Sequence, residues 1–227
     1  MNVASNLAAV RARIEAAARR AGRGRDDVCL VAVGKTWPPG ALQEALDAGV
    51  RDLGENRAQE LRDKVAALGD RARWHFIGHL QTNKVRHVVG VAHLVHSVDR
   101  VELARAVSRR AAGLGVEQAV LIEVNVAGEA SKHGVAPEDA VELAAEVAAL
   151  DRVRVRGLMT VAPWPDRAED SRPVYAELAR IGRAVAASVP GATELSMGMT
   201  RDFEVAVEEG ATIVRVGEAI FGRRARP

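Results

Sequence analysis

The amino-acid sequence predicts an α/β protein, a single (β/α)8 barrel of the TIM type with an extra helix at its amino-terminal end. Strand-like and helix-like segments alternate along the whole chain, and no long polar linker or shift of composition divides them. The 227 residues also match the usual length of such a barrel, so we expect one domain over residues 1–227. The runner-up is an open doubly wound sheet, but no G-x-G-x-x-G motif follows the first strand to support it.

The predicted elements follow from hydrophobic spacing and from the glycines and prolines that end them. Leu7, Val10 and Ile14 repeat at helical spacing. They predict a helix over Asn6–Ala21, which ends at Gly22 and precedes the first strand. The eight strands are expected at Val28–Val33, near Asp52-Leu53, and at Trp74–Ile77, His93–Ser97, Ala119–Val126, Val153–Thr160, Glu194–Ser196 and Ala211–Val216. The helices between them are expected at Pro39–Ala48, Arg57–Leu68, after Gln81, and at Arg100–Gly113, Pro137–Leu150, Arg167–Ser188 and Arg201–Glu209.

Composition excludes several classes of protein. Hydrophobic residues make up 48% and charged residues 27%, which supplies a packed core and argues against disorder. The net charge is only +2 and the two signs are mixed along helical stretches, so we expect solvated helix faces and no nucleic-acid partner. No stretch approaches the roughly 20 apolar residues of a membrane span, and the first residues lack the apolar run of a secretory signal, so we expect none. Cys29 is the single cysteine, which excludes an internal disulfide, and we expect a cytoplasmic protein.

The most informative residue is Lys35, which follows the first predicted strand. An apolar run ends there, and Pro38 and Pro39 stop the strand from continuing. Lys35 is therefore expected at the carboxyl end of the strand, where α/β barrels place their chemistry. A lysine on partly apolar ground can lose its proton and form a Schiff base with an aldehyde. Taken alone, a lysine after a strand is more often simply solvated.

Polar and glycine-rich clusters follow the other strands too, and the last two indicate a phosphate site. Barrels often bind phosphate with the loops after strands seven and eight, through backbone N–H groups at the start of a short helix. Ser196 supplies a hydroxyl, and Gly198 and Gly217 let the backbone approach an oxyanion closely. The short helix would be Glu218–Phe221; the alternative is a pair of ordinary turn glycines. With Lys35 opposite, pyridoxal 5′-phosphate becomes the expected cofactor, because it carries both an aldehyde and a phosphate.

Arg215 lies within the apolar eighth strand, where a permanent charge is costly to bury without a partner. One interpretation is a structural ion pair with a rim carboxylate such as Glu55. The other places the guanidinium against the pyridine nitrogen of the cofactor, which keeps that nitrogen unprotonated and weakens the ring as an electron sink.

Other chemistries find little support. His75 and His79 straddle a strand end and a glycine turn, and no H-E-x-x-H motif occurs, so no metal site is expected. His133 and the remaining histidines show no ligand-type companions in the sequence. A serine hydrolase would need a G-x-S-x-G turn, which is absent. A phosphosugar-type barrel enzyme could use the same phosphate loops and would not need Lys35.

Eight segments together resemble the YggS/PROSC family of pyridoxal phosphate homeostasis proteins over nearly the whole chain. They are V-A-V-G-K-T (31–36), G-E-N-R-A-Q-E (54–60), W-H-F-I-G-H-L-Q-T-N-K (74–84), S-V-D (97–99), V-N-V (124–126), G-L-M-T (157–160), L-S-M-G-M-T-R-D (195–202) and V-R-V-G-E-A-I-F-G (214–222). The resemblance implies a barrel like the amino-terminal domain of alanine racemase, with the cofactor on Lys35 as an internal aldimine. It also implies a cofactor site lined by Asn56, Ser196, Gly198, Arg215 and Gly217.

The same resemblance implies a carrier or regulator of pyridoxal phosphate without established catalytic turnover. Apoenzymes that need the cofactor are the candidate protein partners. Gly34 and Trp37 stand where family members often have serine and a polar residue such as lysine, and both flank Lys35.

The alternative is an amino-acid racemase of the alanine racemase type. That reaction needs a second acid or base opposite the lysine, a tyrosine from a separate β domain, and the chain ends just after the last barrel element. The single tyrosine, Tyr175, is expected in the helix after strand six, away from the rim. We therefore expect a carrier, and a monomer.

Overall fold

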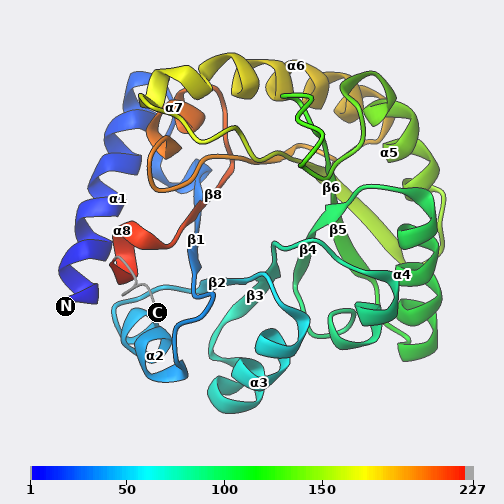
Figure 1. Cartoon of the computed structure of the whole chain (residues 1–227), viewed down its shortest axis with the longest axis horizontal. Helices are drawn as coiled ribbons and strands as arrows, with labels where there is room; N and C mark the ends of the chain where they lie inside the picture. Colours follow the sequence, from blue (N-terminus) through cyan, green and yellow to red (C-terminus); the bar gives the residue numbers. More distant parts are fainter. Residues whose placement is uncertain (1, 223–227) are drawn as a thin grey trace.

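Eight parallel strands close into a barrel in which each strand pairs with the next one in the chain and β8 pairs with β1 (Figure 1). The computed structural model describes residues 2–222, so both ends of the domain predicted over residues 1–227 lie outside the described residues. The predicted barrel is confirmed, and the doubly wound sheet is excluded. The strands are β1 (Cys29–Val33), β2 (Asp52–Glu55), β3 (Arg73–Phe76), β4 (Leu94–Val98), β5 (Gln118–Glu123), β6 (Val153–Met159), β7 (Glu194–Ser196) and β8 (Ile213–Val216).

Helices surround the barrel, with α1 on the outside against α7, α8 and α2. The face of α1 that carries Leu7, Val10 and Ile14 is buried, as its spacing predicts. The helix therefore stands outside the repeating strand–helix pattern, which confirms the extra amino-terminal helix. The α-helices are α1 (Val3–Arg20), α2 (Pro39–Asp47), α3 (Ala58–Leu68), α4 (Val101–Leu114), α5 (Ala140–Ala148), α6 (Arg172–Ser188), α7 (Phe203–Glu208) and α8 (Glu218–Phe221).

The segment after Gln81 differs from the prediction, since it forms the 3-10 helix η3 (Thr82–His87) and not an α-helix. Only Val85 of its six residues is buried, so no apolar stripe holds a longer α-helix against the barrel. Two predicted helices also begin with a 3-10 turn, η4 (Pro137–Asp139) before α5 and η5 (Ala168–Ser171) before α6. These differences change the boundaries and leave the order of elements intact.

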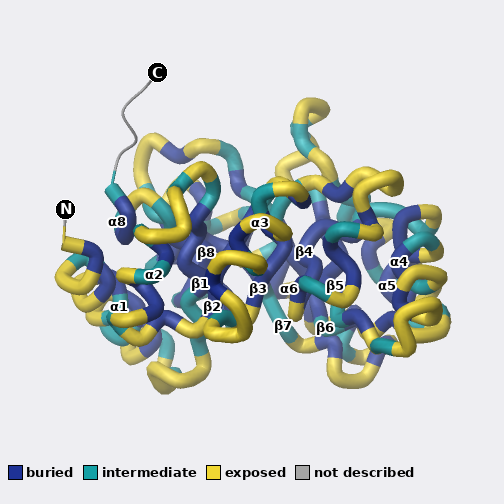
Figure 2. The backbone as a smooth tube through the Cα atoms, turned by 90° about the horizontal axis from the view of Figure 1, so that it is seen from below, coloured by how far each residue is buried: buried dark blue, intermediate teal, exposed yellow. Residues whose placement is uncertain are grey.

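The main core lies between the barrel and its helices, and a smaller apolar cluster lies inside the barrel. Figure 2 shows the buried strands at the centre and the exposed surfaces of the helices around them. Successive side chains of a strand point to opposite faces, so each strand contributes to both. The inner apolar cluster comes from five strands and consists of Val31, Leu94, Leu121, Met159 and Ile213.

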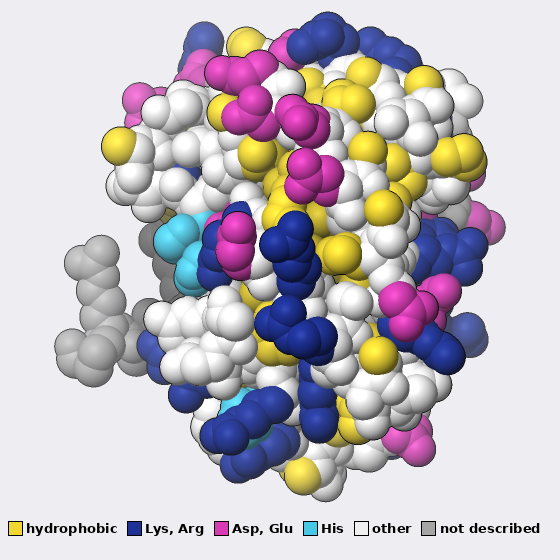
Figure 3. Space-filling view, turned by 90° about the vertical axis from the view of Figure 1, so that its right-hand side faces the viewer, with side chains coloured by type: hydrophobic (Ala, Val, Ile, Leu, Met, Phe, Trp, Pro, Cys, Tyr) yellow, Lys and Arg dark blue, Asp and Glu magenta, His cyan; other side chains and the backbone are white. Residues whose placement is uncertain are grey.

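The outer surface carries charges of both signs. On the face over α4 and α5, acidic side chains gather in the upper centre of the view and basic side chains below them (Figure 3). No described helix combines the length and the apolar character needed to cross a membrane.

Candidate functional site

A cavity of about 240 Å³ opens at the carboxyl-terminal ends of the strands and contains Lys35, Arg215 and Gly217. The loops after β1, β6, β7 and β8 supply its walls. This is the edge at which parallel barrels place their functional groups. The other lining residues are Val33, Trp37, Ile77, Trp164, Pro165, Met199, Thr200, Arg201, Asp202, Glu218 and Gly222.

Lys35 lies two residues past the end of β1 and is half-buried in the wall of this cavity. The next residue, Thr36, has a φ of 67°, a left-handed conformation that is costly for a β-branched side chain. Its N–H donates to Glu60 Oε2 at 3.0 Å, which helps to hold the turn. The backbone therefore turns sharply just after Lys35.

The two residues that depart from the resembled family pattern have structural explanations. A Cβ atom at Gly34 would lie 2.8 Å from Leu42 Cδ2, so the leucine of α2 occupies the space that a serine would need. The Trp37 ring lies against Phe221 of α8, with their centroids 5.9 Å apart, and it also lines the cavity. Gly34 thus leaves room for α2, and Trp37 packs against α8 at the cavity.

Arg215 is 5% exposed and reaches the cavity from inside the barrel. Its Nη1 donates to Ser196 Oγ at 2.6 Å, and its Nη2 donates to the backbone carbonyl of Thr160 at 2.8 Å. Burial lowers the pKa of the guanidinium, which nevertheless stays charged at neutral pH because arginine starts so high. The two hydrogen bonds fix the plane of a buried cation at the cavity wall.

The interpretation of Arg215 as the partner of Glu55 in an ion pair is wrong. Glu55 shares the outer face of β2 with Leu53 of the main core, and its carboxylate contacts Lys64 of α3. Arg215 shares the inner face of β8 with Ile213. The two side chains are thus on opposite sides of the barrel wall.

Arg215 is instead the upper end of a buried hydrogen-bonded chain that crosses the barrel. Ser196 Oγ lies 2.9 Å from His96 Nδ1, and His96 Nε2 lies 2.9 Å from His75 Nδ1. His75 Nε2 in turn lies 3.0 Å from Asp52 Oδ1. Five inward-facing side chains from β2, β3, β4, β7 and β8 are therefore linked in one path.

A single placement of protons satisfies this whole chain when both histidines are neutral. Arg215 donates to Ser196, whose hydroxyl donates to His96 Nδ1; His96 Nε2–H then donates to His75 Nδ1. His75 Nε2–H donates to the Asp52 carboxylate. Complete burial, and after it the neighbouring His75, lower the pKa of His96 well below its usual value, which favours the neutral form of His96. The chain is thus polarised in one direction, from a guanidinium to a carboxylate.

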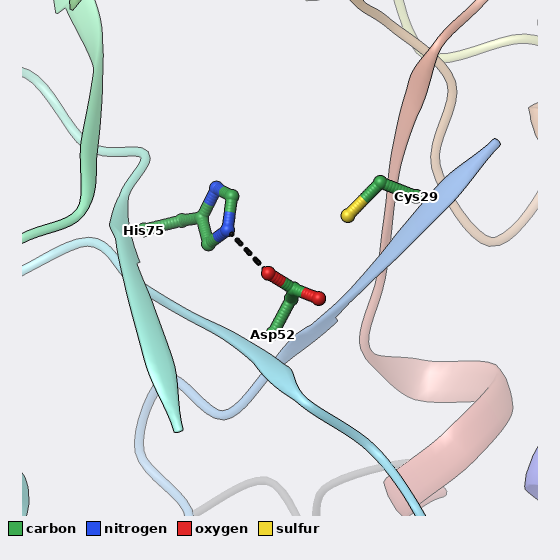
Figure 4. Close-up of side chains that lie close together, drawn as sticks. All are labelled: Cys29, Asp52 and His75. Atoms are coloured by element: carbon green, nitrogen blue, oxygen red, sulfur yellow. Dashed lines mark hydrogen bonds and ion pairs between the residues drawn. The ribbon is translucent and has the colours of Figure 1, made fainter. Parts of the chain in front are cut away.

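The lower end of the chain lies at the floor of the barrel, where Cys29, Asp52 and His75 point toward one another from three adjacent strands (Figure 4). Arg73 Nη2 donates to Asp52 Oδ2 at 2.8 Å. Burial works against ionisation of Asp52, but the hydrogen bonds from His75 and Arg73 outweigh it and lower its pKa. Burial, and then Asp52, raise the pKa of the Cys29 thiol to about 12. Cys29 is therefore a protonated packing residue, as the sequence indicates.

The other sequence-predicted site residues lie around the cavity or apart from it. Ser196 is fully buried between Arg215 and His96. Gly198 has a φ of 89°, and a Cβ atom there would lie 2.5 Å from that of Ala206, so glycine lets the loop pack on α7. Its carbonyl accepts the backbone N–H of Arg215 at 3.0 Å, which ties this loop to β8. Asn56 lines a separate cavity together with residues 79–81.

Sequence reasoning missed two features of the site. The chain through His75 and His96 was not predicted, although inward-facing positions on β3 and β4 could have been found from the alternation of the strands. A second cluster lies at the rim, where the structure brings together His79, Asp99 and His133. The two histidines lie 54 positions apart in the sequence, and no neighbouring residue there marks them as metal ligands. The signal that could have found this cluster is that all three residues follow neighbouring strands of the predicted barrel. Tyr175 is fully buried in α6, and burial, with the nearby Asp202, raises its pKa.

Comparisons with known proteins agree over the full length of the chain. Residues 5–225 match the family model described as the alanine racemase amino-terminal domain. The chain is 45% identical over 229 residues to a pyridoxal phosphate homeostasis protein of Aquifex aeolicus, covering 99% of each. It is 39% identical over 227 residues to the protein of the same name from Escherichia coli, covering 98% of this chain and 97% of that one.

Solved structures show the same barrel. PipY of Synechococcus elongatus, with PLP bound, superimposes with a TM-score of 0.83 at 34% identity, covering 97% of this chain and 100% of that one. Alanine racemase of Clostridium difficile in complex with cycloserine gives a TM-score of 0.74 at 15% identity, covering 99% of this chain and 60% of that one. The second likeness is one of fold alone.

Proposed function

This chain belongs to the family of pyridoxal phosphate homeostasis proteins, and we propose that it binds pyridoxal 5′-phosphate and takes part in the intracellular homeostasis of this cofactor. The observation that carries the proposal is the meeting of Lys35, Arg215 and Gly217 in one cavity at the carboxyl-terminal rim of the barrel. An amine, a buried cation and a glycine-containing loop match the aldehyde, the pyridine nitrogen and the phosphate of that cofactor. The PLP-bound relative, PipY, supports the assignment.

Lys35 would hold the cofactor covalently through its aldehyde. When bound, the cofactor supplies an electron-accepting ring, and the cation at Arg215 would weaken that property by disfavouring a proton on the ring nitrogen. Arg215 suits this position because Ser196 and Thr160 fix its guanidinium before any ligand arrives. On this basis we assign Arg215 the role of orienting the pyridine ring of the cofactor.

The phosphate would lie against the loop after β7 and the start of α8. A Cβ atom at Gly217 would come within 3.1 Å of the carbonyl of Val33, so glycine permits a close approach of the two backbone segments. Thr200 lines the cavity, and its Oγ1 lies 3.3 Å from the backbone N–H of Ala219. Gly198 shapes the same loop, and Ser196 would act through Arg215 from beneath it. Asn56, in a neighbouring cavity, would contribute at the edge of the site.

We assign the chain the role of a carrier or regulator without catalytic turnover. Racemisation needs a second acid or base across from the lysine. The described residues that line the cavity include no histidine, tyrosine or cysteine, and Tyr175 is fully buried in α6. The cavity also contains the carboxylates Asp202 and Glu218, and Asp202 already accepts hydrogen bonds from Ser171 and from the backbone N–H of Met199. Cytoplasmic apoenzymes that require pyridoxal phosphate would be the recipients, and the carrier would act as a monomer.

Borohydride reduction of the cofactor-loaded protein, followed by peptide mass analysis, tests the assignment. The chain has four lysines, at positions 35, 64, 84 and 132, so the label can be placed without ambiguity. We expect it on Lys35, with loss of the visible absorption band in Lys35→Ala and retention of both in Lys84→Ala. A label on another lysine, or none, would refute the proposal. Sustained turnover of alanine or other amino acids at rates of roughly 1–1000 per second would refute the carrier role.

A further inference from the structure

Three potential metal ligands meet on the rim of the barrel, outside the cavity of Lys35. One ligand atom from each of His79, Asp99 and His133 lies within 4.8 Å of the other two. His79 Nδ1 is 3.7 Å from Asp99 Oδ2, and the rings of His79 and His133 stack with their centroids 3.7 Å apart. No other group of residues at the rim, in the described part of the chain, brings two imidazoles and a carboxylate this close together.

The fold holds these three groups in fixed places. His79 follows β3 just after Gly78, where a Cβ atom would lie 2.1 Å from the carbonyl oxygen of Asn56. Asp99 directly follows β4. His133 lies in the loop after β5, which is closed by a bridge between Val124 and Val135. The ligands therefore come from the segments that follow three neighbouring strands of the barrel.

A buried carboxylate beside the cluster supplies an independent reason for a cation there. Glu123 at the end of β5 is 9% exposed and lines one cavity together with His79 and His133. Its Oε2 has no hydrogen-bond partner among the described residues. An unpaired buried carboxylate is costly, and a positive ion in this cavity would offset that cost.

The charges around the cluster leave the relevant atoms available. Arg100 binds Asp99 through Oδ1, so that Oδ2 remains directed to His79. Lys132 lines the cavity as well, but its Nζ lies 3.4 Å from both Glu129 Oε2 and the carbonyl of Ala162. These cations weaken the attraction for a metal ion without blocking its ligands.

We propose that His79, Asp99 and His133 form a binding site for a divalent transition-metal ion of the zinc type, with Glu123 as a nearby counter-charge. Two imidazoles and one carboxylate are a donor set that suits Zn²⁺, whereas Mg²⁺ and Ca²⁺ prefer oxygen ligands alone. Three protein ligands leave a fourth position open. Ile77 lines both this cavity and the cavity of Lys35, so the ion would adjoin the cofactor site without being part of it.

Binding requires one local change, which the structure permits. Metal–nitrogen distances near 2 Å bring tetrahedral ligand atoms to about 3.3 Å from one another, closer than the present limit of 4.8 Å. His133 is exposed, so its ring can rotate off His79 without disturbing the core.

The second cluster of possible ligands, at the barrel floor, is already committed. Asp52 is bound by Arg73 and His75, and His75 also binds His96. The Cys29 thiol beside them is protonated. We therefore expect no metal ion at the floor cluster, and a substitution there serves as a control for binding at the rim.

Titration calorimetry with ZnCl2 at pH 7.5, on cofactor-free protein without a histidine tag, tests the proposal. We expect one Zn²⁺ per chain, and a visible Co²⁺ spectrum of a tetrahedral or five-coordinate site. Outer partners of metal ligands are typically worth 10–100-fold in affinity, so His79→Ala, His133→Gln and Asp99→Asn should each weaken binding at least about 100-fold. Glu123→Gln should weaken it about 10-fold.

Matched controls make the result decisive. His87→Ala removes a half-exposed histidine outside the cluster, and Cys29→Ser removes the thiol of the floor cluster. Both should bind Zn²⁺ as the parent protein does. His133→Gln changes an exposed residue, so its effect cannot arise from unfolding. Absence of saturable binding, unchanged binding in His133→Gln, or loss of binding in Cys29→Ser would each overturn the proposal, and none of them bears on pyridoxal phosphate.

Discussion

Replacing Ser196 with alanine should destabilise the protein through the buried chain that crosses the barrel. The Ser196 hydroxyl is fully buried and has two partners, Arg215 Nη1 at 2.6 Å and His96 Nδ1 at 2.9 Å. Ser196→Ala leaves the guanidinium short of one acceptor and the imidazole short of one donor. His96 is completely buried, so its Nδ1 would be left without a donor in the interior.

The magnitude follows from the kinds of hydrogen bond that are lost. A bond to a charged group contributes about 1.5–3 kcal/mol, and a neutral one about 0.5–1.5 kcal/mol. The free energy of unfolding should therefore fall by about 3 kcal/mol. For a chain of this length that corresponds to a Tm lower by about 6–12 °C.

Urea denaturation and thermal melting measure the loss, and Ser97→Ala is a matched control. Ser97 is also fully buried, but its Oγ has no hydrogen-bond partner among the described residues. Its removal should leave stability unchanged or slightly higher, because an unsatisfied hydroxyl is removed from the interior. Equal effects of Ser196→Ala and Ser97→Ala, or a loss below about 1 kcal/mol for Ser196→Ala, would refute the stabilising role of the chain.

Two further predictions concern groups outside the cavity. Lys64→Met should cost about 3–5 kcal/mol in urea denaturation, because it strips the fully buried Glu55 of its cation. Burial already raises the pKa of Glu55, so the loss of stability should shrink as the pH falls and the carboxylate takes up a proton. Adding Glu55→Gln should recover most of the lost stability. A loss below about 1 kcal/mol for Lys64→Met would contradict the argument. Cys29 in the folded protein should react with iodoacetamide at pH 8 roughly 1000-fold more slowly than in urea, because a pKa of about 12 leaves little thiolate. Asp52→Asn should speed this alkylation, and similar rates in folded and unfolded protein would disprove the assigned pKa.

The fold could be predicted because local signals agree with one another along the whole chain. The bounds of β7 (Glu194–Ser196) and of the short helix α8 (Glu218–Phe221) are those that the sequence predicts. Proline and glycine mark most of the other ends. The segment at Thr82–His87 could not be assigned as a 3-10 helix, since a short polar stretch with one buried valine has no periodicity to analyse.

The cavity could be predicted in part for a different reason. Lys35, Arg215 and Gly217 follow or end strands of a parallel barrel, and such positions meet at one rim whatever the details of packing. The partner of Arg215 depended on which face of its strand each side chain occupies. Glu55 and Arg215 face opposite sides of the barrel wall, so the ion pair, one of the two interpretations that the sequence left open, is wrong.

The polar interior of the barrel calls for an explanation beyond stability. Buried polar chains of this kind often contribute no more than well-packed apolar side chains would, and the inner cluster of valine, leucine, methionine and isoleucine shows that this barrel accepts apolar filling. The chain from Asp52 to Ser196 ends at Arg215, the one described member that also lines the cavity. Each hydrogen bond in the chain decides whether the next group must act as donor or acceptor. The orientation of Arg215 therefore depends on groups as far away as the barrel floor. Fixing a buried guanidinium at the cavity wall accounts for the histidines in a way that stability alone does not.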